Sequence, residues 1–287
     1  MKNVLVAGAS GNLGKYVVTA LKERGFCVTA LTRKKNRLQE IEPYYERAFV
    51  ADATDANALR GACTEIDVAV SCLGGSVNPS LSGGRQSFQD VDFHANMNLL
   101  KEAASQSVKK FIYVGVYGHE VYGELNYVKA HELFAKELTA SNIPSTIVRP
   151  TGFFSSFGEL FKMAKMGRAI VFGDGEVRTN PIHEDDLAHV CVDAINQDVR
   201  EINVGGPEIF TRRQAVELAF KALDKTPRIS HLPIGLLQTF SKIAKPFNKR
   251  ISEILAFFAK ISEVDVVAPK QGERTLRAYF QQLAEQA

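Results

Sequence analysis

The stretch Val4-Leu5-Val6-Ala7-Gly8-Ala9-Ser10-Gly11-Asn12-Leu13-Gly14 decides the fold of this chain of 287 residues. A short apolar run predicts a strand, the glycine-rich segment predicts a turn, and apolar residues at helical spacing predict a helix after it. In that order Gly8 permits a tight exit from the strand, Gly11 lets a phosphate approach the backbone, and Gly14 lets the helix lie close to the strand. Free N–H groups at the start of the helix favour a pyrophosphate. We therefore expect a dinucleotide to contact Gly8, Ser10, Gly11, Asn12 and Leu13.

The glycine spacing, Gly-x-x-Gly-x-x-Gly, resembles the opening motif of the extended and atypical branch of the short-chain dehydrogenase/reductase superfamily. The resemblance implies a doubly wound sheet and a bound nicotinamide dinucleotide. Further apolar runs predict strands at 27–32, 48–50, 68–71, 110–114, 145–149 and 202–205. We therefore expect an α/β fold, a Rossmann-type doubly wound parallel sheet of about seven strands with a small C-terminal lobe. Residues 1–152 form the expected dinucleotide-binding core, and residues 153–287 return to the core sheet and form the smaller substrate lobe.

The composition is that of a folded globular protein and argues against several other classes. The formal charge is +3 and the basic residues are scattered, which argues against a nucleic-acid partner. The chain enters its first strand without a signal peptide, and no uninterrupted apolar run is long enough to form a transmembrane segment. The four cysteines lack the paired spacing of a disulfide framework or a zinc site. We therefore expect reduced thiols, no metal and a cytoplasmic location.

The end of the second predicted strand bears on the choice between NADPH and NADH. NAD-selective Rossmann folds place a carboxylate about 20 residues after the glycines, where it binds the ribose 2′-hydroxyl. Here the strand ends at Thr32, and the cations Arg33, Lys34 and Lys35 follow. Because a guanidinium forms paired hydrogen bonds with a phosphate, the pattern favours NADP(H) over NAD(H), with Arg33 on the 2′-phosphate. The alternative is a solvated basic turn at the edge of the sheet.

The resemblance assigns further cofactor contacts to three turns. It implies that Asp52, followed by Ala53, meets the edge of the adenine ring. Cys72-Leu73-Gly74 ends the fourth predicted strand at the carboxyl edge, where cofactors lie in open α/β sheets. Pro150-Thr151-Gly152-Phe153 resembles the family's turn under the nicotinamide, and the alternative is a plain exit from a strand. An apolar wall there lines a substrate pocket or belongs to the core, and its residues are Phe153, Phe154 and Phe157.

The catalytic assignment rests on the helix after the fifth predicted strand. Short-chain dehydrogenases have a Ser after that strand and Tyr-x-x-x-Lys on the helix, where the Lys lowers the pKa of the Tyr so that the phenol gives a proton to a carbonyl oxygen. Here Gly115 stands in the place of the Ser and His131 in the place of the Lys. Tyr127 and His131 share a helix face. In one interpretation, His131, with Tyr127, supplies a proton or positions the substrate; in the other, both are ordinary helix residues and the usual chemistry is absent.

These departures indicate the atypical branch, which contains the NmrA-like regulators, the isoflavone-reductase-like enzymes and the divinyl chlorophyllide 8-vinyl reductases. Five strings resemble the last group, namely those at 70–73, 148–154, 171–175, 205–208 and 233–235. Those reductases have a Lys where His131 stands and a longer C-terminal region. We consider two functions. The first is an NADPH-dependent oxidoreductase acting on a small or mid-sized apolar substrate, and the alternative is a non-catalytic NAD(P)-binding regulator or assembly factor.

Three further segments carry open interpretations. Residues 76–89 form either a flap near the nicotinamide or an unengaged surface loop. Residues 234–261 have a helical pattern broken near Pro246, with apolar residues on one side. They form a lid, an oligomer interface, a membrane-surface element or a face packed on their own lobe. Asp55 is expected to cap a helix over residues 56–62.

Overall fold

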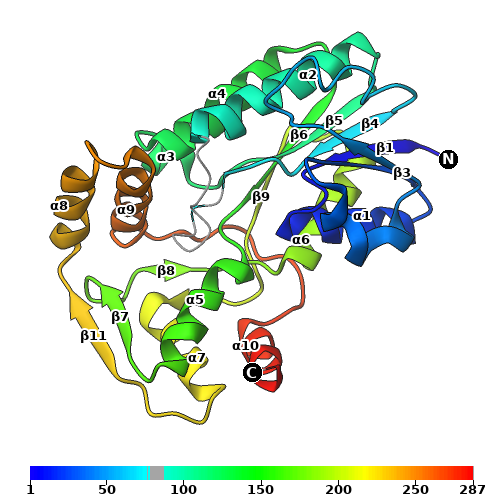
Figure 1. Cartoon of the computed structure of the whole chain (residues 1–287). Helices are drawn as coiled ribbons and strands as arrows, with labels where there is room; N and C mark the ends of the chain where they lie inside the picture. The colour runs from blue at the N-terminus through cyan, green and yellow to red at the C-terminus, as the bar shows by residue number, and fades with distance from the viewer. Residues whose placement is uncertain (76, 78–86, 287) are drawn as a thin grey trace.

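Seven parallel strands form the central sheet of the computed structural model, which describes residues 1–75, 77 and 87–286 (Figure 1). In spatial order they are β3 (Arg47–Val50), β2 (Cys27–Thr32), β1 (Asn3–Ala7), β4 (Val68–Ser71), β5 (Lys110–Val114), β6 (Ser145–Pro150) and β9 (Glu201–Val204). The direction of winding reverses between β1 and β4, as in doubly wound sheets that bind nucleotides at this point. The predicted Rossmann-type sheet is confirmed.

Helices cover both faces of this sheet, which explains why its strands read as continuous apolar runs. One face packs against α1 (Asn12–Glu23), the 3-10 helices η1 (Lys35–Tyr44) and η4 (Ala194–Asn196), and α6 (Glu184–Asp193). The other face packs against α2 (Ala95–Ser105), α4 (Asn126–Ala140) and the segment around residues 59–66. Successive residues of β1 alternate between the two cores, with Val4 and Val6 toward α1 and Leu5 and Ala7 toward α2.

A smaller lobe lies beside the carboxyl edge of the sheet (Figure 1). It contains α5 (Phe154–Lys165), α7 (Arg212–Lys221), α10 (Leu276–Glu285) and the parallel pair of β7 (Ala169–Phe172) and β11 (Ile229–Leu232). Its own core is aromatic: Phe154, Phe157, Phe161, Phe220 and Phe280 are buried there. Of the two interpretations of the aromatic wall, the core is therefore correct for Phe154 and Phe157.

Asn180 joins the lobe to the sheet and is fully buried. It follows β8 (Arg178–Thr179), which pairs with β10 (Phe210–Thr211). Its amide nitrogen donates to the carbonyl oxygens of Gly206 (3.1 Å) and Ala268 (2.9 Å), and its amide oxygen accepts from the Ala268 N–H (3.0 Å). One side chain thus holds together three segments that are distant in the sequence. A Cβ atom at Gly205 would overlap this amide, so the close approach requires glycine.

The helices α8 (Ile234–Ala244) and α9 (Lys249–Ile261) lie side by side and form a helical hairpin that projects from the lobe (Figure 1). The predicted helical break near Pro246 is confirmed. The π-helical turn η3 (Gln89–His94) precedes α2, and the short α3 (His119–Tyr122) precedes α4. Among the helices that the structure describes, none has the length and hydrophobicity needed to span a bilayer.

One predicted helix is absent: residues 56–62 form successive turns instead. The expected capping contact exists, because Oδ1 of Asp55 accepts the N–H groups of Asn57 (2.9 Å) and Ala58 (3.3 Å). The left-handed φ of +83° at Gly61 interrupts any helix, and its N–H donates to Oε1 of Glu102 (2.9 Å) on α2. The expected flap falls mostly on residues 76 and 78–86, which lie outside the described residues.

Candidate cofactor and catalytic site

The glycine turn between β1 and α1 is shaped by backbone contacts. Gly8 has a left-handed φ of +77°, and a Cβ atom there would lie 2.9 Å from the carbonyl oxygen of Cys72. A Cβ atom at Gly14 would overlap the carbonyl oxygen of Gly8 and lie 2.9 Å from the Cα of Ala9. Gly11 is the N-cap of α1, and no side chain of the described residues caps this helix. The first N–H groups of α1, including those of Asn12 and Leu13, therefore suit an anion.

The turn after β4 lies directly beside the glycine turn, at the point where the sheet changes direction. The Cys72 N–H donates to the carbonyl oxygen of Ala7 (2.9 Å), and the Leu73 N–H contacts Oγ of Ser71 (3.3 Å). Burial raises the pKa of the Cys72 thiol to about 12, so the thiol stays protonated and is a poor nucleophile. At the carboxyl edge of the sheet, Cys72, Leu73 and Gly74 thus offer a ligand backbone groups and apolar surface, and no reactive side chain.

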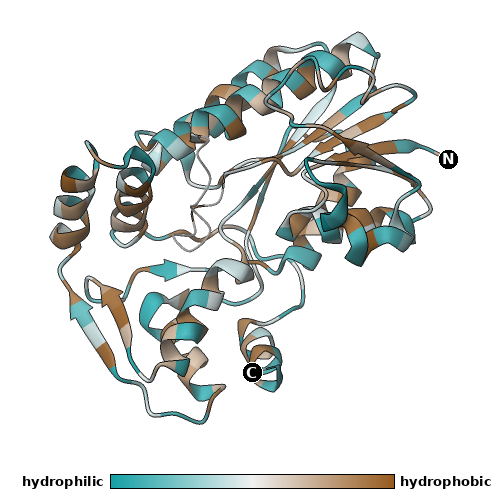
Figure 2. Ribbon diagram, viewed as in Figure 1, coloured by the Kyte–Doolittle hydropathy of each residue, from teal (hydrophilic) through white to brown (hydrophobic). Residues whose placement is uncertain are grey.

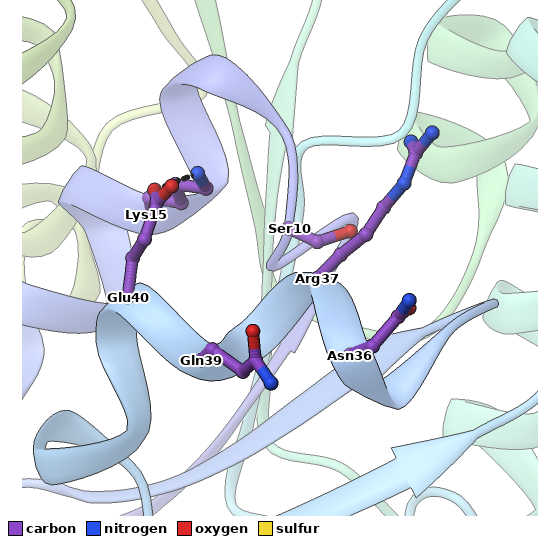
Figure 3. Close-up of a pocket in the computed structure, with 6 residues that line it drawn as sticks. All are labelled: Ser10, Lys15, Asn36, Arg37, Gln39 and Glu40. Atoms are coloured by element: carbon purple, nitrogen blue, oxygen red, sulfur yellow. Dashed lines mark hydrogen bonds and ion pairs between the residues drawn. The ribbon is translucent and has the colours of Figure 1, made fainter.

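A cavity of about 370 Å³ adjoins the glycine turn on the side of β2 (Figure 3). Its lining consists of Ser10, Lys15, Asn36, Arg37, Gln39 and Glu40. The Ser10 and Thr32 hydroxyl groups are 2.9 Å apart, so the glycine turn is tied to the end of β2 just before Arg33. Lys15 forms an ion pair with Glu40, which offsets the one carboxylate in the lining. Of the basic residues that follow β2, the predicted Arg33 is not in this lining, whereas Arg37, which the sequence analysis did not single out, is.

The Asp52 turn after β3 is locked by local hydrogen bonds. Oδ1 of Asp52 accepts from the Thr54 N–H (3.0 Å) and from the Thr54 hydroxyl (2.8 Å). The carbonyl oxygen of Ala53 accepts from the side-chain amide of Asn98 on α2 (3.0 Å). This turn lies at the carboxyl end of a strand that is two places from β1 in the sheet.

The turn after β6 connects the sheet to the lobe. The Thr151 hydroxyl donates to the carbonyl oxygen of Asn180 (2.6 Å), and the Thr151 N–H donates to Val204 (3.1 Å). The Pro150 carbonyl oxygen accepts the Tyr117 N–H (3.1 Å). Phe153 is the N-cap of α5 and pairs with Ile182 in an isolated bridge. The backbone of this turn is therefore well fixed at the carboxyl edge of the sheet.

His131 lies in a buried polar cluster and is only 3% exposed. Its Nδ1 is 2.5 Å from the Tyr113 hydroxyl on β5, and its Nε2 is 3.2 Å from Oδ1 of Asp92. Oδ1 of Asp92 also accepts the Gly75 N–H (2.7 Å). Nε2 of His131 and Oδ2 of Asp92 are among the buried side-chain atoms of the described residues that have no hydrogen-bond partner, so the imidazole is held through Nδ1, to which the Tyr113 hydroxyl can donate its hydrogen. Burial raises the pKa of Tyr113 well above its ordinary value, which keeps that hydrogen in place.

Tyr127 contacts His131 as the shared helix face predicts, with ring centroids 4.8 Å apart in an edge-on arrangement. Phe88 and Phe257 pack around the Tyr127 ring at 5.1 and 5.4 Å. Burial raises the pKa of the Tyr127 phenol, so it is a proton donor rather than a base near neutral pH. The guanidinium of Arg250, from α9, lies over the Phe88 ring at 4.0 Å.

The structure therefore adds three polar residues to the predicted pair, namely Asp92, Tyr113 and Arg250. A signal for Asp92 exists in the sequence, because it lies four residues before Asn96 on a helix that is otherwise apolar on this side. Both are fully buried, and Oδ1 of Asn96 accepts the Ser71 hydroxyl at 2.5 Å. Gly115, at the position where the resemblance implies a serine, has no side chain to offer a hydroxyl. A Cβ atom there would lie 3.3 Å from the Ile147 side chain.

Comparison with known proteins agrees with this geometry. A family model described as NAD(P)H-binding matches residues 8–198. The chain belongs to this NAD(P)H-binding family. Its relatives include the divinyl chlorophyllide a 8-vinyl-reductases of Oryza sativa subsp. indica and Arabidopsis thaliana, both chloroplastic. The rice protein is 29% identical over 98% of this chain and 78% of its own length, and the Arabidopsis protein is 30% identical over 94% and 71%.

Other similar proteins are less similar in sequence. The photosystem II assembly factor Ycf39 of Synechocystis is 21% identical over 88% of this chain and 78% of its own length. Solved structures share the fold. One is the NADPH-dependent quinone oxidoreductase QOR2 of Escherichia coli, solved in complex with NADPH. It superposes with a TM-score of 0.77 over 98% of this chain and 99% of its own length, at 17% sequence identity. A nucleoside-diphosphate-sugar epimerase from Staphylococcus aureus superposes with a TM-score of 0.71 over 98% of this chain and 100% of its own length, at 16% sequence identity.

Proposed function

We propose that this member of the NAD(P)H-binding family is an NADPH-dependent oxidoreductase. The observation that carries the proposal is the cavity beside the glycine turn, where Ser10, Asn36 and Arg37 offer hydrogen-bond donors and Lys15 offsets the carboxylate of Glu40. A ribose 2′-phosphate needs such donors, whereas NAD selectivity is typical of an unpaired carboxylate at the end of β2. Arg33, the next residue after β2, is exposed and carries a second guanidinium, although it is not one of the residues that line the cavity.

In this proposal the cofactor contacts follow the carboxyl edge of the sheet. The pyrophosphate lies on the turn of Gly8, Ser10 and Gly11 and on the start of α1, the adenine lies near Asp52 and Ala53, and the nicotinamide lies between the turn 72–74 and the turn of Pro150, Thr151 and Phe153. When bound, the reduced nicotinamide supplies a hydride. The Tyr127–His131 pair supplies the proton that completes the reduction. The Tyr113 hydroxyl is hydrogen-bonded to Nδ1 of the imidazole, and Asp92 lies 3.2 Å from its Nε2.

We propose an apolar substrate reduced at a double bond. The reductase relatives are named for the reduction of a vinyl group, and their identity of 29–30% to this chain supports a carbon–carbon double bond as one substrate class. A carbonyl group is the other class, because the structure contains a phenol, Tyr127, that remains protonated near the imidazole.

The second candidate is a non-catalytic NAD(P)-binding assembly factor. Two observations favour it: both ring nitrogens of His131 face protein groups, and no polar side chain stands at Gly115. The relatives named as photosystem II assembly factors add support from sequence. This candidate needs the same nucleotide site but no proton donor.

A two-stage experiment tests these proposals. Fluorescence titration of the purified protein with NADPH and NADH measures binding, and Arg33→Asp is expected to weaken NADPH far more than NADH. NADPH consumption is then measured with enones, vinyl-substituted macrocycles, aldehydes and ketones. Consumption with one class supports the oxidoreductase, and tight NADPH binding without consumption supports the assembly factor. Failure of the folded protein to bind either nucleotide would overturn both.

A further inference from the structure

The hairpin of α8 and α9 presents an apolar stripe to solvent. Leu236, Phe240 and Ile243 lie on one face of α8 at helical spacing, and all three are exposed. Phe247, in the turn between the helices, is 86% exposed, and Ile251 on the first turn of α9 is 43% exposed. We call these five residues the hairpin stripe. An exposed apolar set of this size and order is typical of an interaction surface.

The hairpin holds the stripe in place through its own ordered contacts. Ser241 on α8 is buried against α9, where its hydroxyl donates to the carbonyl oxygen of Ser252 (2.8 Å). Asn248 caps α9 by accepting the Ile251 N–H (3.1 Å), and the Phe247 N–H donates to the carbonyl oxygen of Ala244 (3.0 Å). Phe247 is therefore exposed on an ordered turn and not on a frayed end.

The hairpin attaches to the rest of the molecule through α9. The Asn126 side chain donates to Glu253 (2.7 Å), Phe257 packs on Tyr127, and Arg250 lies over Phe88. Figure 1 shows α8 on the outer side of α9, away from the central sheet, and Figure 2 shows apolar residues along both helices. The hairpin stripe therefore remains exposed to solvent although α9 packs against the rest of the molecule.

Charge is concentrated in the same segment. Residues 234–261 contain five basic residues and one acidic residue, a formal charge of +4, whereas the whole chain has +3. Lys242, Lys245 and Lys249 are exposed and interleaved with the stripe in the sequence. Exposed aromatic and aliphatic side chains with lysines among them are typical of helices that lie in the interface of an anionic bilayer.

We propose that the α8–α9 hairpin docks on the surface of a membrane that contains anionic lipids. Phe247 and Phe240 enter the boundary between headgroups and acyl chains, and the three lysines contact lipid phosphates. Pairing with a second copy is less favourable, because a two-fold interface is self-complementary and would place two segments of charge +4 against each other. The surface lies outside the nucleotide cavity, so the inference does not depend on the proposed chemistry.

Vesicle flotation tests the proposal with the full-length protein. Vesicles of phosphatidylcholine with 30% phosphatidylserine are compared with pure phosphatidylcholine, and we expect binding only to the anionic vesicles. Each lysine near such a surface contributes about fivefold, so Lys245→Gln with Lys249→Gln should weaken partitioning about 30-fold. Phe247→Ser should also weaken it, at constant salt, because it removes an inserted ring. Higher ionic strength should reduce binding further.

Matched variants separate docking from general effects. Met166→Ser removes another exposed apolar side chain, 71% exposed, and Lys101→Gln removes a lysine on α2, so both should bind vesicles as the unmodified protein does. Absence of binding to anionic vesicles would overturn the proposal. So would binding that Phe247→Ser leaves unchanged, or a dimer in sedimentation velocity that the same substitution dissociates. Circular dichroism and unchanged NADPH titration check that the variants are folded.

Discussion

Nε2 of His131 lies 3.2 Å from Oδ1 of Asp92, inside the protein and under the turn that follows β4. The same carboxylate oxygen accepts the Gly75 N–H, so one buried group links α4 to the carboxyl edge of the sheet. Tyr113 fixes the other ring nitrogen. His131, at the position where the resemblance to short-chain dehydrogenases implies a lysine, is therefore buried between Asp92 and Tyr113.

Removing the Tyr113 hydroxyl should destabilise the fold. In Tyr113→Phe the Nδ1 atom of His131 loses its donor while remaining buried, which costs about 1–3 kcal/mol. Urea denaturation followed by circular dichroism measures the free energy of unfolding. Tyr16→Phe is the control, because Tyr16 is 38% exposed whereas Tyr113 is fully buried. Equal stability of the two variants would contradict the hydrogen bond between Tyr113 and His131.

Gly14→Ala should prevent close packing of α1 on the glycine turn. The added Cβ overlaps the Gly8 carbonyl oxygen, which belongs to the backbone and cannot rotate away. We expect a loss of about 1–3 kcal/mol in stability and weaker NADPH binding. Gly235→Ala is the matched control, because nothing lies within 4 Å of its added Cβ. If Gly14→Ala behaves like this control, the packing role of Gly14 is wrong.

The sequence predicted those parts of the molecule that depend on local order. The strand, turn and helix around Gly8 follow from periodicity and glycine spacing, and so does the hairpin broken near Pro246. Asp92 and Asn180 were missed because their contacts are with residues far along the chain: Asn180, for example, binds Ala268. The absent helix at 56–62 has the same origin, since Glu102 on α2 takes the Gly61 N–H. The structure at these positions depends on tertiary contacts, which the periodicity of the sequence does not reveal.

Arg37→Ala should separate NADPH from NADH. If Arg37 binds the 2′-phosphate in the cavity it lines, loss of a charge-assisted hydrogen bond costs about 1.5–3 kcal/mol, or about 10- to 150-fold in the dissociation constant for NADPH. NADH lacks that phosphate, so its affinity should change little. Fluorescence titration with both nucleotides measures the ratio. Gln39→Ala, which alters an uncharged residue of the same lining, serves as the control, and an equal loss for both nucleotides in Arg37→Ala would contradict the assignment.

Arg149 should be one of the more costly polar side chains to remove. It is 3% exposed, and its guanidinium pairs with Glu132 and Glu201 and donates to the carbonyl oxygen of Val116 (3.1 Å). Arg149→Met leaves Glu132, whose side chain is only 18% exposed, without its arginine partner, and we expect a loss of about 3–5 kcal/mol in stability. Arg178→Met breaks an exposed pair with Asp265 and should cost less than about 1 kcal/mol. Comparable urea midpoints for the two variants would refute the difference.

The stability of the protein should fall as the pH drops below about 6.5, and His183 should account for part of the fall. His183 is the N-cap of α6, where its Nδ1 accepts the Asp185 N–H (3.1 Å), and a protonated imidazole cannot accept there. Burial lowers the pKa of His183, although the nearby Glu184 carboxylate acts in the opposite sense.

The sign follows from linkage. The unfolded chain binds a proton at His183 near pH 6.5 and the folded protein only at a lower pH, so the stabilising contribution is complete above that value and is lost as the pH falls through the folded pKa. The carboxyl groups of Asp67 and Asp265 also have lowered pKa values, but they start from 3.8 and act at more acidic pH. Free energies of unfolding at pH 7.5 and 5.5 give the slope. His183→Asn keeps a capping oxygen without the titration, so its slope should be shallower than that of the unmodified protein, and an identical slope would assign the acid sensitivity elsewhere.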